Sequence, residues 1–189
     1  MINKKFIQKL KKEYVTSNSE RRQIISMSNI VLHDSKRIIF ALHRGDMKKG
    51  ENMFSSVESI LTKLEKKFGF KRITSEGSYR ACVEEYVEAK MFYFLITGKK
   101  IDAIKGLKIN YDSYLGGICD AMGEMVRRAV NKASSGELDE VAKLKKVVND
   151  VMAELVEFDM AGYLRTKYDQ ARGHLRKIEQ INYDVNIRK

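Results

Sequence analysis

Two acidic residues of this chain stand in apolar surroundings. Glu85 and Glu88 lie three residues apart in residues 81–95, where apolar side chains fall nearly all round the expected helix, the pattern of a buried helix. Two carboxylates in such company are costly unless a cation joins them. That cation would be a metal ion or an arginine, so the pair is a candidate site.

Asp120 and Glu124 form a second acidic pair. They are four residues apart, so both carboxylates project from one face of a helix. Taken alone, such a pair is more often a solvated polar face than a site. Gly116 and Gly117 precede it and weaken a helix without obvious benefit. A close approach by another helix or by a ligand would explain these glycines.

Two carboxylates from each of two helices can make an all-oxygen nest, which suits Mg²⁺ or Mn²⁺. A di-iron bundle would instead require Glu-x-x-His ligands, and no glutamate in the sequence is followed by histidine three residues later. No Cys/His spacing fits zinc. Cys82 and Cys119 are too few for a disulfide framework, and we expect both to be reduced thiols.

The balance of charge favours an anionic partner. The 189 residues include 36 lysines and arginines against 25 acidic residues, a formal net charge of +11. Such an excess fits nucleic acid or an anionic membrane, or a basic protein with neither partner. Residues 1–6 begin no apolar run long enough for a signal peptide, and no uncharged stretch could span a bilayer. We therefore expect a cytoplasmic protein with no membrane partner.

The elements that position these residues are predicted to be helices. The chain contains no proline, which permits long uninterrupted helices. Glycines and polar clusters divide the helical pattern into seven segments, so we predict an all-α, seven-helix bundle in a single domain, residues 1–189. A polar run at residues 16–19 makes the first break, with Ser19 as a candidate N-cap. The predicted helices cover residues 4–15, 20–44, 46–68, 75–98, 111–133, 137–158 and 163–185.

Basic residues near the acidic pairs are candidates to bind nucleic-acid phosphates. Arg37, His43 and Arg44 lie along the second predicted helix, and Arg127 follows the second acidic pair. Aromatic residues of the fourth predicted helix could stack on bases, although aromatics at helical spacing are more often core. These aromatics are Tyr79, Tyr86, Phe92 and Tyr93.

Four segments together resemble the translin family. Residues 35–44 (SKRIIFALHR) and 85–89 (EYVEA) resemble the branch of translin-associated factor X, and residues 114–127 (YLGGICDAMGEMVR) resemble a segment with the family's Asp-x-x-Gly-Glu pattern. Residues 164–188 resemble the C-terminal helix of translin itself. The similarity runs from about Ser19 to the end of the chain, with the segments in the family's order.

This resemblance implies a seven-helix fold, a hollow particle of eight subunits, and binding of single-stranded RNA, possibly also of single-stranded DNA. The factor X branch supplies Mg²⁺-dependent endoribonuclease activity. Carried over by motif, the catalytic residues are Glu85, Glu88 and Asp120, and Glu124 joins them as a metal ligand. All four positions are acidic here, so we expect a homo-oligomer that both binds and cleaves RNA. The missing factor X insertion is compatible with an archaeal source.

Two other hypotheses remain open on the sequence alone. The chain could bind single-stranded RNA or DNA without turnover, with the acidic residues forming a structural ion-pair network. It could also be a scaffold protein whose basic charge serves solubility.

Overall fold

The computed structural model describes residues 2–187, and within them every regular element is a helix. The predicted all-α fold is therefore confirmed. The last residues of the family-like tail, Arg188 and Lys189, lie outside the described residues. In chain order the helices are α1 (Lys4–His43), α2 (Met47–Phe68), α3 (Phe70–Thr74), α4 (Gly77–Ile96), α5 (Tyr111–Ser134), α6 (Leu138–Leu155) and α7 (Gly162–Ile187).

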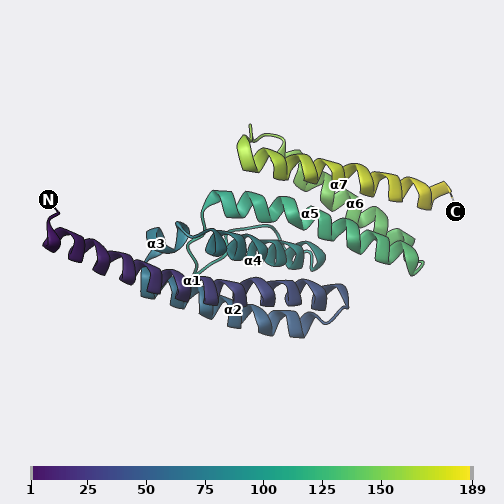
Figure 1. Cartoon of the computed structure of the whole chain (residues 1–189). Coiled ribbons are helices and arrows are strands. Elements are labelled where there is room, and N and C mark those ends of the chain that lie inside the picture. Colours follow the sequence, from purple (N-terminus) through teal and green to yellow (C-terminus); the bar gives the residue numbers. More distant parts are fainter. Residues whose placement is uncertain (1, 188–189) are drawn as a thin grey trace.

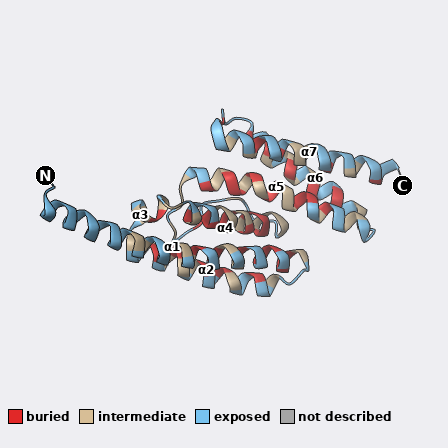
Figure 2. Ribbon diagram, viewed as in Figure 1, coloured by how far each residue is buried: buried red, intermediate tan, exposed pale blue. Residues whose placement is uncertain are grey.

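The long helices form successive layers, as Figure 1 shows. Helix α1 packs against α2 on one side and α4 on the other, and α4 packs in turn against α5. Helices α6 and α7 pack against each other and against the outer side of α5. Helix α4 therefore lies in the middle of the bundle, and its residues are mostly buried or half-buried (Figure 2). This agrees with the buried character that its sequence predicts.

The predicted break at residues 16–19 is wrong, because α1 continues through this polar run without interruption. Serine, threonine and asparagine are only moderately unfavourable in a helix, and the run contains neither glycine nor proline. Arg72 also holds this part of α1, since its guanidinium donates to the backbone carbonyl of Ser17 (3.4 Å) and to Glu20 (3.2 Å). Contacts from Arg72 thus help to hold a segment whose own helix propensity is only weakly unfavourable.

The sequence pattern also does not predict α3, a single turn that begins after Gly69. Gly69 has a φ of 81°, a left-handed conformation that suits glycine and ends α2. The structure therefore has seven helices among the described residues, but two predicted helices are one, and α3 supplies the seventh.

The first part of α1 projects beyond the bundle. Residues 2–17 are all exposed, and Figures 1 and 2 show this arm extending past the end of α2. Among residues 2–187, none of the helices has the combination of length and apolar character needed to span a bilayer.

The core fills the spaces between α4 and its neighbours. Tyr86 and Phe92 are fully buried there, and Tyr79 and Tyr93 are nearly so. The structure thus places all four candidate base-stacking aromatics of α4 in the core. Cys82 and Cys119 are also buried and form no disulfide, and burial raises the pKa of each thiol to about 12.

Candidate functional site

Two glycines bring the acidic helices together. A Cβ atom added to Gly117 would lie 2.7 Å from the Cβ of Val87 and 2.8 Å from the backbone nitrogen of Glu88. A Cβ added to Gly116 would lie 2.4 Å from a carboxylate oxygen of Glu84. Helix α5 therefore approaches α4 more closely than a residue with a side chain allows. The close helix approach that these glycines predicted is confirmed, and it brings the two acidic pairs to one place.

Glu88 lies at the centre of this acidic group. It forms no hydrogen bond or ion pair with another of the described residues. Burial is the largest cause that raises the pKa of Glu88, to about 8. The negative charges of Glu85, Asp120 and Glu124 raise this pKa in the same direction. The four predicted carboxylates therefore interact electrostatically, although the two pairs lie more than thirty residues apart in the sequence.

Glu85 faces α1. Its carboxylate lies 3.9 Å from the ammonium of Lys36. Burial raises the pKa of Glu85, and the charge of Lys36 offsets only part of this effect. Glu85 is therefore the acidic residue that connects the interior of the site with the basic surface of α1.

Asp120 shares a cation with a fifth carboxylate. Lys167 of α7 donates to Asp120 (2.5 Å) and lies 2.8 Å from an oxygen of Glu84. Tyr163, one turn earlier on α7, donates to Glu84 (2.5 Å). Burial still raises the pKa of Asp120, with Lys167 acting in the opposite direction. The hydrogen bonds to Asp120 and Glu84 outweigh burial and raise the pKa of Lys167, so this lysine carries its charge.

Glu124 is held by α1 and by its own helix. His43 forms a short hydrogen bond to Glu124 through Nε2, and Arg127 lies 3.5 Å from the same oxygen. Burial raises the pKa of Glu124, but the hydrogen bond and charge of His43 outweigh it, and Arg127 adds to them. The net pKa lies below its usual value. The imidazole of His43 packs on Phe92, with ring centroids 4.8 Å apart, and its Nδ1 is buried without a partner among the described residues.

The donor set of this site suits a hard cation, because all five carboxylates offer oxygen ligands. Burial and three acidic neighbours keep Glu88 mostly protonated near neutral pH, and a bound metal ion would take the place of that proton. In the arrangement described for residues 2–187, however, no three His, Cys, Asp or Glu side chains converge closely enough to ligate one ion. Asp120 and Glu124 point instead to Lys167 and His43.

The predicted phosphate ligands fall into two groups. Arg37, Arg44 and Arg127 are exposed, as a contact with nucleic acid requires. Arg37 also forms an ion pair with Asp34 (3.3 Å). The side chain of His43 is only 5% exposed, so the structure places it with the carboxylates and not on the surface.

Sequence reasoning missed two members of the acidic network. Helical spacing places Glu84 on one polar side of α4 with Glu76 and Arg80, but α7 covers its carboxylate. The sequence does contain a pattern that identifies Lys167. This lysine lies three residues after Leu164 and four before Ala171, on the apolar stripe of the last helix. A lone lysine on such a stripe needs an acidic partner.

Fold and site together define a helical-bundle protein with a half-buried carboxylate network. The translin family pattern matches residues 19–189, and the chain belongs to the translin family. The protein is similar to an uncharacterized protein of Methanocaldococcus jannaschii, with 27% identity over 165 residues that cover 85% of this chain and 73% of the relative. It is also similar to the translin-associated protein X homolog of Schizosaccharomyces pombe, with 26% identity over 199 residues that cover 94% and 86%.

Solved structures share the whole fold. The crystal structure of AfC3PO matches with a TM-score of 0.88 and 21% identity, covering 97% of this chain and 98% of the other. The crystal structure of apo-NeC3PO matches with a TM-score of 0.85 and 22% identity, covering 98% of each chain. A structure of an AfC3PO–duplex RNA complex matches with a TM-score of 0.85 and 20% identity, covering 97% of each. These matches support the translin-like bundle that the sequence predicted.

Proposed function

We propose that this protein is an endoribonuclease that binds single-stranded RNA in a homo-oligomeric particle of eight subunits and cleaves it with Mg²⁺ or Mn²⁺. The observation that carries the proposal is Glu88, a half-buried and unpaired carboxylate among three other acidic residues. A purely structural network would pair such a group, because a buried carboxyl without a partner is destabilising once it ionises. Functional sites often retain such unfavourable groups.

The metal ligands in this proposal are Glu85, Glu88, Asp120 and Glu124. When bound, a divalent ion would stabilise negative charge on the scissile phosphate. Glu88 is the proposed general base, with Glu85 as the alternative, because its pKa of about 8 lies near the working pH and a bound divalent ion would lower it, leaving an ionised carboxylate that can accept a proton. Lys167 and His43 are positioning residues, since they hold Asp120 and Glu124.

The proposed substrate follows from the surface charge and from the family. The chain has a net charge of +11, Arg37, Arg44 and Arg127 are exposed, and Arg127 lies 3.5 Å from Glu124. One solved structure with this fold is described as a complex of AfC3PO with duplex RNA. A single strand is proposed as the cleaved form, because its flexible backbone can reach carboxylates that lie between helices.

Cleavage of an end-labelled RNA oligonucleotide tests this function. We expect the wild-type protein to cleave the single strand with Mn²⁺ or Mg²⁺ and not with EDTA, and to cleave the matching duplex much more slowly. Glu88→Gln should lose at least 100-fold in rate, the low end of a general-base contribution, while it binds RNA as tightly as wild type. Glu140→Gln is the matched control, because Glu140 lies on α6, outside the acidic group, with a 43% exposed side chain that pairs with Lys143. Equal cleavage by the wild type and Glu88→Gln would refute the site assignment.

The alternative function is a single-stranded RNA- or DNA-binding protein without turnover. The contact of Lys167 with both Asp120 and Glu84 favours this alternative, because a bound lysine already neutralises part of the acidic group. It predicts tight oligonucleotide binding in EDTA and no cleavage with any divalent metal ion.

A further inference from the structure

A second feature of the surface lies beside the acidic site. It is a cleft of about 540 Å³ on the outer face of α1, close to the start of α2. Most of its lining side chains are basic, and one is a phenylalanine. The cleft is lined by His33, Lys36, Arg37, Phe40, Ala41, Arg44, Asp46 and Lys49.

Phe40 is the only Phe, Tyr or Trp side chain that the structure describes in this cleft, which His33 also lines, and Phe40 is 55% exposed. It lies four residues after Lys36 and four residues before Arg44, so the three side chains follow one face of α1. The guanidinium of Arg44 lies 6.0 Å from the ring centroid, within range of a cation–π contact. An exposed apolar ring between two cations matches the chemistry of one nucleotide, which has a flat base between charged phosphates.

Lys36 links the cleft to the acidic site. Lys36 lines the cleft and also lies 3.9 Å from Glu85. Lys36 and Arg44 are eight residues apart, about 12 Å along a helix, so a nucleotide and its two flanking phosphates can lie between them. A strand that follows this face of α1 reaches Glu85 directly after it passes Lys36.

We propose that this cleft is a nucleotide-binding subsite in which Phe40 stacks on one unpaired base. Lys36 and Arg44 contact the phosphates on either side of that nucleotide. Base-pairing and stacking within a duplex cover both faces of a base, so the subsite selects single strands or unpaired ends. The position of the subsite relative to the cleaved bond depends on the proposed nuclease function, but the stacking contact does not.

The alternative is that a second copy of the chain covers the exposed ring of Phe40. The charges around the ring oppose this occupant, because the cleft carries four lysines and arginines against a single aspartate. Burying such a face against another copy would desolvate several like charges. The proposal therefore assigns the cleft to RNA.

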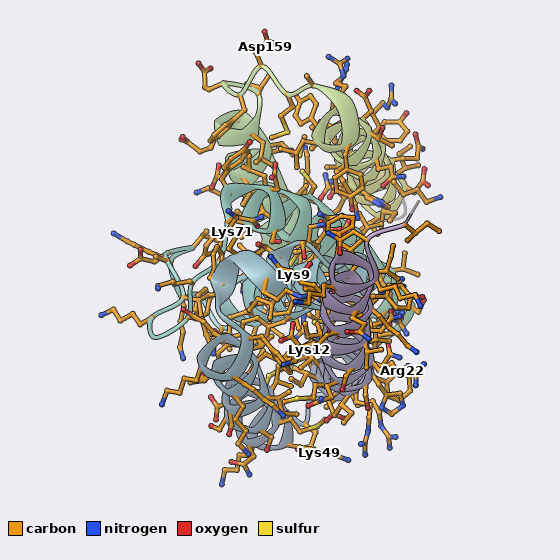
Figure 3. The ribbon with its side chains drawn as sticks, turned by 60° about the vertical axis from the view of Figure 1, so that its left-hand side comes forward. Lys9, Lys12, Arg22, Lys49, Lys71 and Asp159 are labelled. Atoms are coloured by element: carbon orange, nitrogen blue, oxygen red, sulfur yellow. The ribbon has the colours of Figure 1, made fainter. Side chains whose placement is uncertain are left out.

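The absence of tryptophan from this chain makes the proposal directly measurable. Phe40→Trp introduces a single tryptophan into the cleft, and its fluorescence can be excited apart from that of the nine tyrosines. Phe158→Trp introduces one at a 50% exposed position elsewhere. Figure 3 places Asp159, the neighbour of Phe158, on the opposite side of the molecule from Lys49 of the cleft. Each variant is titrated with a single-stranded RNA oligonucleotide in EDTA, which prevents metal-dependent cleavage.

Stacking predicts saturable quenching in Phe40→Trp and little quenching in Phe158→Trp. An abasic oligonucleotide of the same length should not quench, because it has the phosphates without the bases. Phe40→Leu should weaken binding of the single strand about tenfold, in the range measured for lost base–aromatic stacking. Its affinity for the abasic oligonucleotide should remain at the wild-type value.

Three results would overturn the proposal: quenching of both tryptophans to the same extent, unchanged affinity in Phe40→Leu, or a smaller particle mass for Phe40→Leu in light scattering. The last result would assign Phe40 to a contact between copies. The titration contains no metal ion, so its outcome is independent of cleavage. A protein that stacks a base and never cleaves RNA would disprove the nuclease function alone.

Discussion

The ionisation of Glu88 links the site to the stability of the protein. The pKa of Glu88 is about 8 in the folded chain, against 4.5 for an unperturbed glutamate. At a pH between 4.5 and about 8, Glu88 keeps its proton in the folded chain and releases it in the unfolded chain. The contribution of Glu88 to stability is therefore greatest below about pH 4.5 and is lost as the pH rises through 8.

Glu88→Gln should show this dependence without any RNA. Glutamine cannot ionise, so the variant should gain free energy of unfolding relative to wild type as the pH increases from 5 to 9. One unit of pKa difference corresponds to about 1.4 kcal/mol, and we expect a gain of about 2 kcal/mol or more at pH 9. Urea denaturation with EDTA at both pH values measures it, with Glu140→Gln as the control. A difference that does not change with pH would contradict the raised pKa.

The acidic network also shows which residues the sequence could identify. Glu85 and Glu88 stood out because they were carboxylates on an apolar helix, while Asp120 and Glu124 looked like an ordinary polar face. Only the resemblance to the translin family joined the two pairs before the structure placed them together. Lys167 escaped attention because its partner Asp120 lies 47 residues away, and no local pattern identifies a contact at that separation.

At the scale of elements, the approach of α5 to α4 positions the site. Gly117→Ala tests how strictly the two helices depend on it. The added Cβ would meet the backbone nitrogen of Glu88, which cannot move without displacing α4. We expect a loss of about 2 kcal/mol in the free energy of unfolding, the range found when cores are overpacked.

Gly173→Ala provides the matched control, because Gly173 lies within α7 and an added Cβ would meet nothing within 4 Å. Alanine is about 1 kcal/mol better than glycine in a helix interior, so this variant should be slightly more stable than wild type. Urea denaturation of both variants gives the comparison. If both substitutions stabilise the protein equally, then α4 and α5 tolerate a wider separation than the structure shows.

The sequence predicts the existence of most helices, but it does not predict all of their ends. Helices α2, α5, α6 and α7 begin within a residue or two of the predicted positions, because glycines and capping residues mark them. The continuity of α1 was not predictable, because the residues at 16–19 are compatible with either a break or a helix. Contacts from Arg72, which is more than fifty residues away, help to hold the helix there.

At the scale of the whole molecule, the net charge of +11 does not show where an anion binds. Basic residues lie both on the projecting arm of α1 and in the cleft beside the acidic site. Lys9 and Lys12 belong to the arm, and Lys49 belongs to the cleft (Figure 3). A general electrostatic attraction would use both regions equally, whereas a binding site would use mainly the cleft.

Salt dependence separates these two possibilities. Each phosphate contact on a single strand contributes about −0.7 to the slope of log K against log salt concentration. Loss of two cleft cations in Arg44→Gln/Lys49→Gln should therefore reduce the slope by about 1.4. The double variant Lys9→Gln/Lys12→Gln removes the same charge from the arm, which lies outside the part of the chain that matches the family. Its slope should stay close to that of the wild type.

Fluorescence anisotropy of a labelled single-stranded RNA, measured from low to moderate salt in EDTA, gives the three slopes. The two variants have the same net charge, so any difference between them reports position and not total charge. Equal reductions would mean that the strand is held by the overall field of the molecule. A reduction confined to the cleft variant would mean that the strand follows α1 past Phe40, toward the carboxylates that are proposed to cleave it.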